Sequence, residues 1–195
     1  MLNRTIRVYI VEDEPLVLNG YIAMLQGNGI DVVGYSMNAK GAMEAIPALR
    51  PDVAILDINL PDGNGIETVE NIQKSYRLPC ILITGYQNSK QLVDRAAQIG
   101  VYGYLHKPVD EVELISMIKI ALNRFQEEQQ MRKQTTLLQE SLENRKIIER
   151  AKGALIDEFS MKEADAMKYL QKKSRDTNLK MIDVAKSILS NLQKF

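Results

Sequence analysis

The sequence of 195 residues holds a single cysteine, Cys80, so no disulfide can form within the chain. Such sparse use of cysteine is typical of proteins in a reducing compartment. No apolar run approaches the ~20 residues that a membrane-spanning helix needs. The first residues lead into a strand-like run without the apolar segment of a signal peptide. We therefore expect a cytoplasmic protein that makes no contact with a membrane.

Net charge is absent as well, since 25 basic residues balance 25 acidic ones. The balance conceals an asymmetry, because residues 1–123 carry a net charge of −4 and residues 141–195 carry +4. A division of this kind is typical of two modules with different partners. On charge alone, chance explains the division equally well.

Short β-branched runs alternate with helical patterns over about the first 120 residues. Two of the runs are apolar on both faces, as strands covered by helices on both sides are. Helical patterns begin near Leu16, Met43, Ile66 and Leu92. The alternation predicts an α/β fold with a five-stranded, doubly wound parallel sheet. The expected strands are 6–11, 32–33, 53–56, 80–84 and 102–105.

Apolar spacing predicts which face each helix buries. The first helix is expected to bury Leu16, Gly20 and Met24, which lie four residues apart, and the second to bury Met43, Ile46 and Leu49. Beyond the sheet, no proline or glycine occurs from residue 110 to 151, which favours one helix of about 40 residues. Its polar centre makes that helix marginal in isolation, so pairing with a second chain is expected. A flexible polar linker between two helices is the alternative.

The last part of the chain predicts a small all-α unit of three helices, fed by the long helix. Ser160 and Glu163 have the spacing of a capping box, which is expected to start a helix with Ala164 on its apolar face. A final helix is expected over 181–192. Gly153 lies inside the long helix, at a cost of about 1 kcal/mol relative to alanine, which indicates the close approach of another backbone.

Polar residues at the ends of the predicted strands point to phosphoryl chemistry. Glu12 and Asp13 follow the first strand and Asp57 follows the third, so their carboxylates are expected to converge at one edge of the sheet. Converging carboxylates favour Mg²⁺. Thr84 and Lys107, at the ends of the fourth and fifth strands, would bind phosphoryl oxygens, and Asp57 would accept the phosphoryl group. Taken singly, each residue also fits an ordinary turn or helix cap.

Four segments resemble the receiver domains of two-component response regulators, in the order of the predicted strand ends. The segments are 8–15, 54–61, 83–85 and 104–108. The resemblance implies a flavodoxin-like receiver over 1–122 whose Asp57 accepts phosphate from a sensor histidine kinase. It also implies that Glu12, Asp13, Asp57 and the backbone carbonyl of Asn59 hold Mg²⁺.

The same resemblance gives three further residues a role. Thr84 and Lys107 contact the phosphoryl group, and Tyr104 changes orientation as Thr84 shifts. Plain packing is the alternative for Tyr104. The sole histidine, His106, receives no role from the resemblance and is expected to be exposed, and Cys80 is expected in the core.

The segments 147–155, 160–164 and 182–185 resemble the ANTAR domain, which binds hairpins of nascent RNA and prevents transcription termination. The whole chain resembles the antiterminators of the ethanolamine-utilisation type. The expected division is a receiver over 1–122, a coiled-coil linker over 123–143 and an ANTAR domain over 144–195. Lys152 matches the family motif, whereas charge alone suggests the other RNA-binding residues, Arg145, Lys146, Arg150, Lys172, Lys173 and Arg175.

These observations predict a regulator, not an enzyme, because no metal-ligand set or nucleophile–base pair follows residue 110. Phosphorylation would bring two copies together as a homodimer that binds RNA hairpins. A DNA-binding response regulator is one alternative, although the apolar residues, lysine and serine of 181–192 do not suit a recognition helix. A tail that docks a protein is another, and for the basic residues near 175 so is compensation of a helix dipole.

Overall fold

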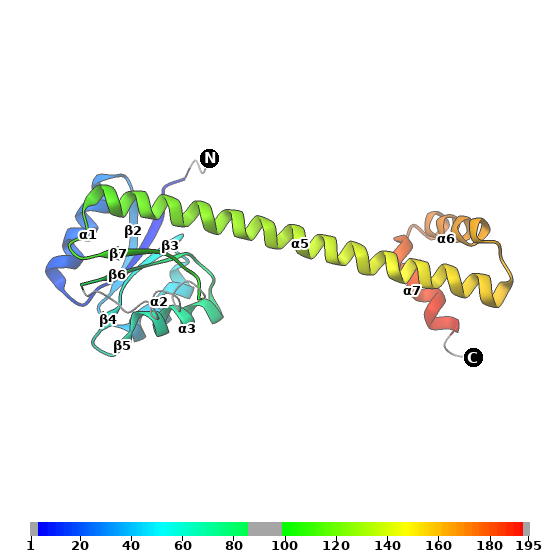
Figure 1. Cartoon of the computed structure of the whole chain (residues 1–195), viewed down its shortest axis with the longest axis horizontal. Coiled ribbons are helices and arrows are strands. Elements are labelled where there is room, and N and C mark those ends of the chain that lie inside the picture. The colour runs from blue at the N-terminus through cyan, green and yellow to red at the C-terminus, as the bar shows by residue number, and fades with distance from the viewer. Residues whose placement is uncertain (1–3, 86–98, 193–195) are drawn as a thin grey trace. The chain divides into compact units, whose positions relative to one another are not determined.

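The computed structural model describes residues 4–85 and 99–192 (Figure 1). Its contacts divide the chain into two compact units, Met1–Gln129 and Gln130–Phe195. The division expected from the sequence, with boundaries at 122 and 143, stays a prediction. Among the described residues, no helix is both long and apolar enough to cross a membrane.

The first unit is built on a five-stranded parallel sheet, which confirms the predicted fold class. The strand order is β2-β1-β3-β6-β7, so β1 and β3 lie side by side in the middle. Each expected strand is present, and all but the second lie within one residue of their expected ends; the second extends three residues beyond its expected end, to Ser36. The strands are β1 (Arg7–Val11), β2 (Asp31–Ser36), β3 (Val53–Asp57), β6 (Cys80–Thr84) and β7 (Val101–His106).

Helices cover both faces of this sheet (Figure 1). On one face, α1 (Pro15–Gly27) and the first turns of α5 (Glu111–Phe159) pack against the strands. On the other face lie α2 (Ala39–Leu49) and α3 (Gly65–Ser75), whose Ile66, Val69 and Ile72 are buried as predicted. The helix expected to begin near Leu92 falls on residues 86–98, outside the described part of the chain.

The expected buried face of α1 is wrong at Leu16, and the expected face of α2 is confirmed only at Ile46. Helix α1 buries Leu18, Tyr21 and Leu25, whereas Leu16 is 86% exposed. The expected set and the buried set have similar helical spacing. The buried set has the larger apolar side chains, because the expected set includes Gly20, which has no side chain to bury. Helix α2 buries Ala39, Ala42 and Ile46, because small side chains allow a close approach to the sheet, and Met43 and Leu49 remain at the surface.

A small hairpin that the sequence did not predict follows Asp57. Strands β4 (Asn59–Leu60) and β5 (Gly63–Asn64) pair antiparallel, with Asn59 opposite Asn64. The Asn64 side chain then accepts a hydrogen bond from the Ile66 amide at 2.8 Å and caps α3. The hairpin thus connects the end of β3 to the start of α3.

The second unit contains α5 from residue 130 onward, together with α6 (Glu163–Thr177) and α7 (Met181–Leu192). The prediction of a three-helix unit is therefore confirmed. The helix α5 is continuous over 49 residues, so the alternative of a flexible linker is wrong. The core is formed by small and branched side chains from all three helices. These are Ala151, Leu155, Ala166, Leu170, Val184 and Ala185.

Three expectations for this unit are wrong. Lys162, not Ser160, is the N-cap of α6, and no side chain caps it. The Glu163 carboxylate accepts a hydrogen bond from Lys152 Nζ at 2.9 Å, so it does not reach back as a capping box requires. Ala164 is exposed, and its expected place in the core is taken by Ala166. A Cβ built on Gly153 meets nothing within 4 Å, so no other backbone of the described residues approaches there.

Candidate functional site

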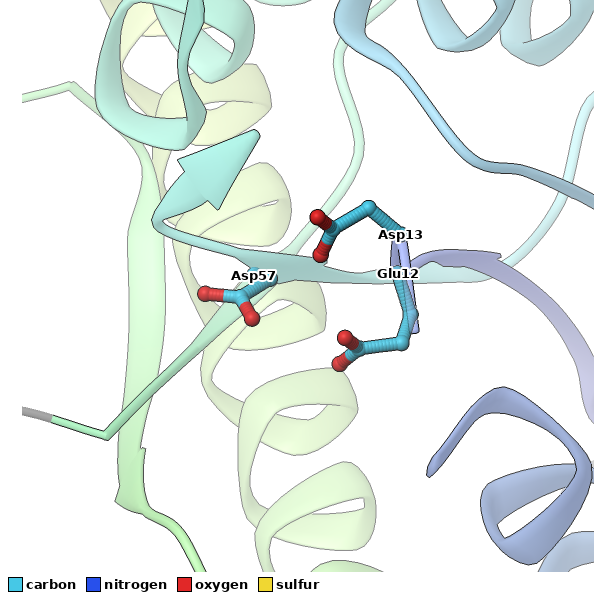
Figure 2. A group of neighbouring side chains, drawn as sticks. All are labelled: Glu12, Asp13 and Asp57. Atoms are coloured by element: carbon cyan, nitrogen blue, oxygen red, sulfur yellow. The ribbon is translucent and has the colours of Figure 1, made fainter. Parts of the chain in front are cut away.

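Three carboxylates meet where the two central strands end. Glu12 and Asp13 directly follow β1, and Asp57 is the last residue of β3. Because β1 and β3 pair with Val11 opposite Leu56, their ends lie level at one edge of the sheet. One oxygen from each of the three carboxylates lies within 4.8 Å of the others. Figure 2 shows the three side chains gathered at this edge. The structure therefore brings together the acidic residues that the sequence predicted.

Backbone contacts fix the two acidic segments. The Glu12 amide donates a hydrogen bond to the Ser36 carbonyl at 3.1 Å, and the Asn59 amide donates to Asp57 Oδ1 at 2.9 Å. Glu12 and Asp57 are only 1% and 5% exposed. Burial raises the pKa of the Glu12 carboxyl, although its contact with Lys107 offsets part of that rise.

Lys107 neutralises part of this negative charge. Its Nζ donates hydrogen bonds to Asp57 Oδ2 and, at 3.0 Å, to Glu12 Oε1. Burial opposes a charge on Lys107, but the bonds to Asp57 and Glu12 outweigh it and raise the pKa of the lysine above its usual range. The lysine is therefore a cation held between two buried carboxylates, in reach of any group attached to Asp57.

Thr84 and Tyr104 lie beside this pocket on neighbouring strands. Thr84 is fully buried at the end of β6, and its carbonyl accepts a hydrogen bond from the Lys107 amide at 2.8 Å. Burial raises the pKa of the Tyr104 phenol, and the Thr84 hydroxyl partly offsets the rise, so the two side chains are neighbours. His106 is exposed and Cys80 is buried, as expected.

The pocket fits a hard divalent cation. Glu12 Oε2 is buried and makes no hydrogen bond of good geometry within the described residues, although Lys107 Nζ lies 2.9 Å away. Carboxylate oxygens are the ligands that Mg²⁺ prefers, and a cation here would satisfy this atom and reduce the repulsion among the three carboxylates.

The sequence prediction missed one polar residue near this site. Asp62 lies at the tip of the β4–β5 hairpin and accepts hydrogen bonds from the backbone of α2. The sequence Pro-Asp-Gly over 61–63 indicates a turn. No local pattern indicates that the partner lies more than twenty residues earlier, at Ala39 and Lys40.

The predicted RNA-binding residues fall into two groups, those that pair with a carboxylate and those that do not. Lys152 is paired with Glu149 at 2.6 Å and with Glu163 at 2.9 Å, and Lys146 is paired with Glu143. The others are exposed and have no carboxylate partner among the described residues. Arg145 and Arg150 lie on α5, and Lys172, Lys173 and Arg175 lie on α6.

Comparison with known proteins agrees with both units. A family model described as the response regulator receiver domain matches residues 8–119, and one described as the ANTAR domain matches residues 136–189. The transcriptional regulatory protein PdtaR of Mycobacterium tuberculosis is 34% identical over 186 residues, which cover 95% of this chain and 90% of that protein.

Other similarities cover less of the chain. The DNA-binding transcriptional activator DevR/DosR of Mycobacterium tuberculosis is 36% identical over 116 residues, 58% of this chain and 53% of that protein. A crystal structure of the receiver domain of a modulated diguanylate cyclase from Desulfovibrio desulfuricans G20 superimposes with a TM-score of 0.60 and 34% identity. The superposition covers 64% of this chain and 99% of the diguanylate cyclase receiver domain in that structure. With a matched receiver, a matched ANTAR domain and a relative similar along nearly its whole length, the chain belongs to the two-component response regulators of the PdtaR type.

Proposed function

We propose that the protein accepts a phosphoryl group on Asp57 from a sensor histidine kinase, forms a homodimer and binds hairpins of nascent RNA to prevent transcription termination. The observation that carries this proposal is the convergence of Glu12, Asp13 and Asp57, with Lys107 bonded to the last of them. A carboxylate beside a fixed cation is poised to act as a nucleophile toward phosphorus.

The transfer is a single displacement at phosphorus. A carboxylate oxygen of Asp57 attacks the phosphorus of a phosphohistidine, so a P–O bond forms as the P–N bond breaks. The imidazole leaves with the electron pair of that bond and takes a proton from solvent. Lys107, held as a cation at Asp57, neutralises charge on the phosphoryl oxygens, and Thr84 offers its hydroxyl to the same group.

Mg²⁺ is the cofactor that the donor set suits. Glu12, Asp13, Asp57 and the backbone carbonyl of Asn59 would hold it. When bound, the ion supplies positive charge beside the phosphoryl group. This chain's own part is to keep the three carboxylates together without the ion, through Lys107 and through the backbone bonds of Glu12 and Asp57.

The signal would leave the pocket through Thr84 and Tyr104. Attraction of the Thr84 hydroxyl toward a phosphoryl group removes a neighbour from the Tyr104 phenol. The ring is half-buried beside the core that α2 and α3 cover, so a new orientation changes the surface around β7. The phosphoryl group thereby shifts the equilibrium between two arrangements of this surface.

Dimerisation is supported by the middle of α5. Residues 130–146 are exposed throughout, and large apolar side chains are among them. Met131 and Leu138 are seven residues apart and Leu142 follows four residues later, which is compatible with the seam of a short coiled coil. Exposed apolar side chains of this kind favour the pairing of α5 with its copy in a second chain. Two tails in one dimer would then bind two hairpins of one transcript with a gain from bivalency.

RNA, not DNA, is the partner that the similarities favour. The match to the DNA-binding DevR/DosR is confined to 116 residues, whereas the match to PdtaR extends over 186. The last helix, Met181–Leu192, buries Val184 and Ala185 in the core of the second unit, so that face is not available to contact bases. Unpaired loop bases of a hairpin are the usual targets of sequence-specific RNA binding.

The test uses the full chain and a small phosphodonor with Mg²⁺. The intact mass should rise by one phosphoryl group, and the variant Asp57→Asn should show no rise. Light scattering should then show a dimer, and hairpin RNA should compete with duplex DNA of the same sequence for the phosphorylated protein. An unchanged mass contradicts the proposed chemistry, and preference for the duplex contradicts the proposed partner.

A further inference from the structure

The segment from the end of β2 to the first turn of α2 contacts both acidic segments of the pocket. On one side, the residue that precedes this helix by three, Ser36, accepts the hydrogen bond of the Glu12 amide. On the other side, the Asp62 carboxylate caps the helix: Oδ1 accepts from the Ala39 amide at 2.7 Å and Oδ2 from the Lys40 amide at 3.0 Å. The end of β2 therefore holds the segment that follows β1, and the first turn of α2 holds the hairpin that follows β3.

Asp62 is connected to the phosphoacceptor by a short series of contacts. It lies at the tip of the hairpin in which Leu60 pairs with Gly63 and Asn59 with Asn64. The Asn59 amide in turn donates to Asp57 Oδ1. At the tip, a Cβ on Gly63 would lie 3.7 Å from the Ala39 Cβ, so the hairpin packs directly on the first residue of α2.

The two α2 amides also affect the charge of Asp62. They hold the pKa of the Asp62 carboxyl below its usual range, since each N–H stabilises the ionised form. The carboxylate is exposed to solvent, so its role is geometric: it fixes the hairpin on a helix that itself packs on the central strands. Leu60 is buried in the core beside α2 and α3, whereas the Asp62 carboxylate supplies the hydrogen bonds that join the tip of the hairpin to α2.

We propose that Asp62 is a positioning residue for the phosphoacceptor pocket: by fixing the β4–β5 hairpin to the N-terminus of α2, it sets the place of Asn59 beside Asp57. The inference rests on the proposed function, because it assigns to Asn59 the backbone contact with Mg²⁺. A variant without the Asp62 carboxylate keeps all three carboxylates of the pocket. Its hairpin, and with it the Asn59 carbonyl, is no longer fixed to α2 and can move.

The experiment measures Mg²⁺ binding by calorimetry on the full, unphosphorylated chain. The variant Asp62→Ala should weaken binding by roughly tenfold, the lower end of what the loss of an outer-shell hydrogen bond costs a metal site. Asp62→Asn keeps an oxygen for an α2 amide and should stay within about twofold of the wild type, since asparagine caps helices as well as aspartate does. Asn38→Ala is the matched control, because Asn38 caps the same helix through the Gly41 amide and makes no hydrogen bond to the hairpin among the described residues.

Each result has one meaning. Equal Mg²⁺ affinity of Asp62→Ala and Asn38→Ala, at similar midpoints of urea unfolding, overturns the positioning role. An Asp62→Asn variant as weak as Asp62→Ala also overturns it, because charge and not the hydrogen bonds to α2 would then be responsible. If the wild type itself binds no Mg²⁺ and gains no phosphoryl mass, the proposed function fails instead, and these comparisons between variants distinguish the two failures.

Discussion

The ring of Tyr102 on β7 meets the ring of Phe125 on α5 edge to face, with centroids 5.7 Å apart and an interplanar angle of 86°. The Tyr102 hydroxyl also donates a hydrogen bond to Glu128. A bulge makes these contacts possible. The pairing of β6 with β7 shifts between Cys80 and Ile81, so Tyr102 is an extra residue in its strand and its side chain turns toward α5. Strand β7 and helix α5 are therefore joined near the end of β7 that lies away from the pocket.

Phe125→Ala is expected to lower the free energy of unfolding of the first unit by about 2 kcal/mol, because it removes half-buried apolar surface and an aromatic pair. Tyrosine fluorescence during urea unfolding measures this loss, since seven of the eight tyrosines precede residue 130 and the chain has no tryptophan. Val112→Ala, in the first turn of the same helix but 76% exposed, is the control and should stay within about 0.5 kcal/mol of the wild type. Equal losses in the two variants would contradict the role of the aromatic pair.

Lys107→Met should destabilise the chain in the absence of divalent ions, because Glu12 and Asp57 lose the cation between them. The loss should be about 2 kcal/mol, below the range for a fully buried pair, since the Lys107 side chain is 19% exposed. Saturating Mg²⁺ should restore more stability to this variant than to the wild type, because binding to the native state adds stability. Thermal melting with and without Mg²⁺ measures the difference, and an equal gain in both proteins argues against a shared site.

Gly65 is required by the close approach of two segments beside the phosphoacceptor. A Cβ at this position would lie 2.2 Å from the Asp57 carbonyl oxygen, which is backbone and has no freedom to yield. Gly65→Ala is expected to cost about 2 kcal/mol and to slow phosphorylation by a small phosphodonor, because the end of β3 must shift. Gly153→Ala, within α5 in open space, should instead stabilise its helix by about 0.5–1 kcal/mol. Denaturant unfolding of both variants checks the opposite signs.

The order of strands and helices and the chemistry of the strand ends follow from the sequence because each depends on local pattern. Apolar runs such as 53–56 and 80–84 predict central strands, and Asp57 directly after one of them predicts a site at the sheet edge. In the second unit, Ala151 and Leu155 keep helical spacing and both are buried, as predicted.

Other features depend on contacts that no local pattern contains. Two sets of residues on α1 have similar helical spacing, and the set that fills more space against the sheet is buried. Leu18 therefore lies in the core and Leu16 does not. The expected capping box failed because Lys152, eleven residues earlier, competes for the Glu163 carboxylate. Asp62 was missed for the same reason, since its two amide partners come from a helix that the turn pattern does not indicate.

The Lys152–Glu163 pair predicts how acid affects the second unit. Lys152 holds the pKa of the Glu163 carboxyl below its usual range through a hydrogen bond and charge. A lowered native pKa means that this contribution to stability is present above the ordinary glutamate value of about 4.3 and is lost as the pH falls through the native value. The variant Glu163→Gln should therefore be less stable than the wild type at pH 7, and this difference should vanish in acid. A difference independent of pH, measured by urea unfolding, would contradict the pair.

The same pair leads to a prediction about which basic residues of the second unit bind RNA. Lys172 and Arg175 are exposed on α6 without a carboxylate partner among the described residues, whereas Lys152 joins two helices. Lys172→Gln and Arg175→Gln should each weaken binding of hairpin RNA and lower the slope of log K against log salt by about one, with unfolding unchanged. Lys152→Gln should lower the stability of the second unit, and its RNA affinity should fall without a matching change in slope. A Lys152→Gln variant with wild-type stability and a reduced slope would instead place that lysine on the RNA.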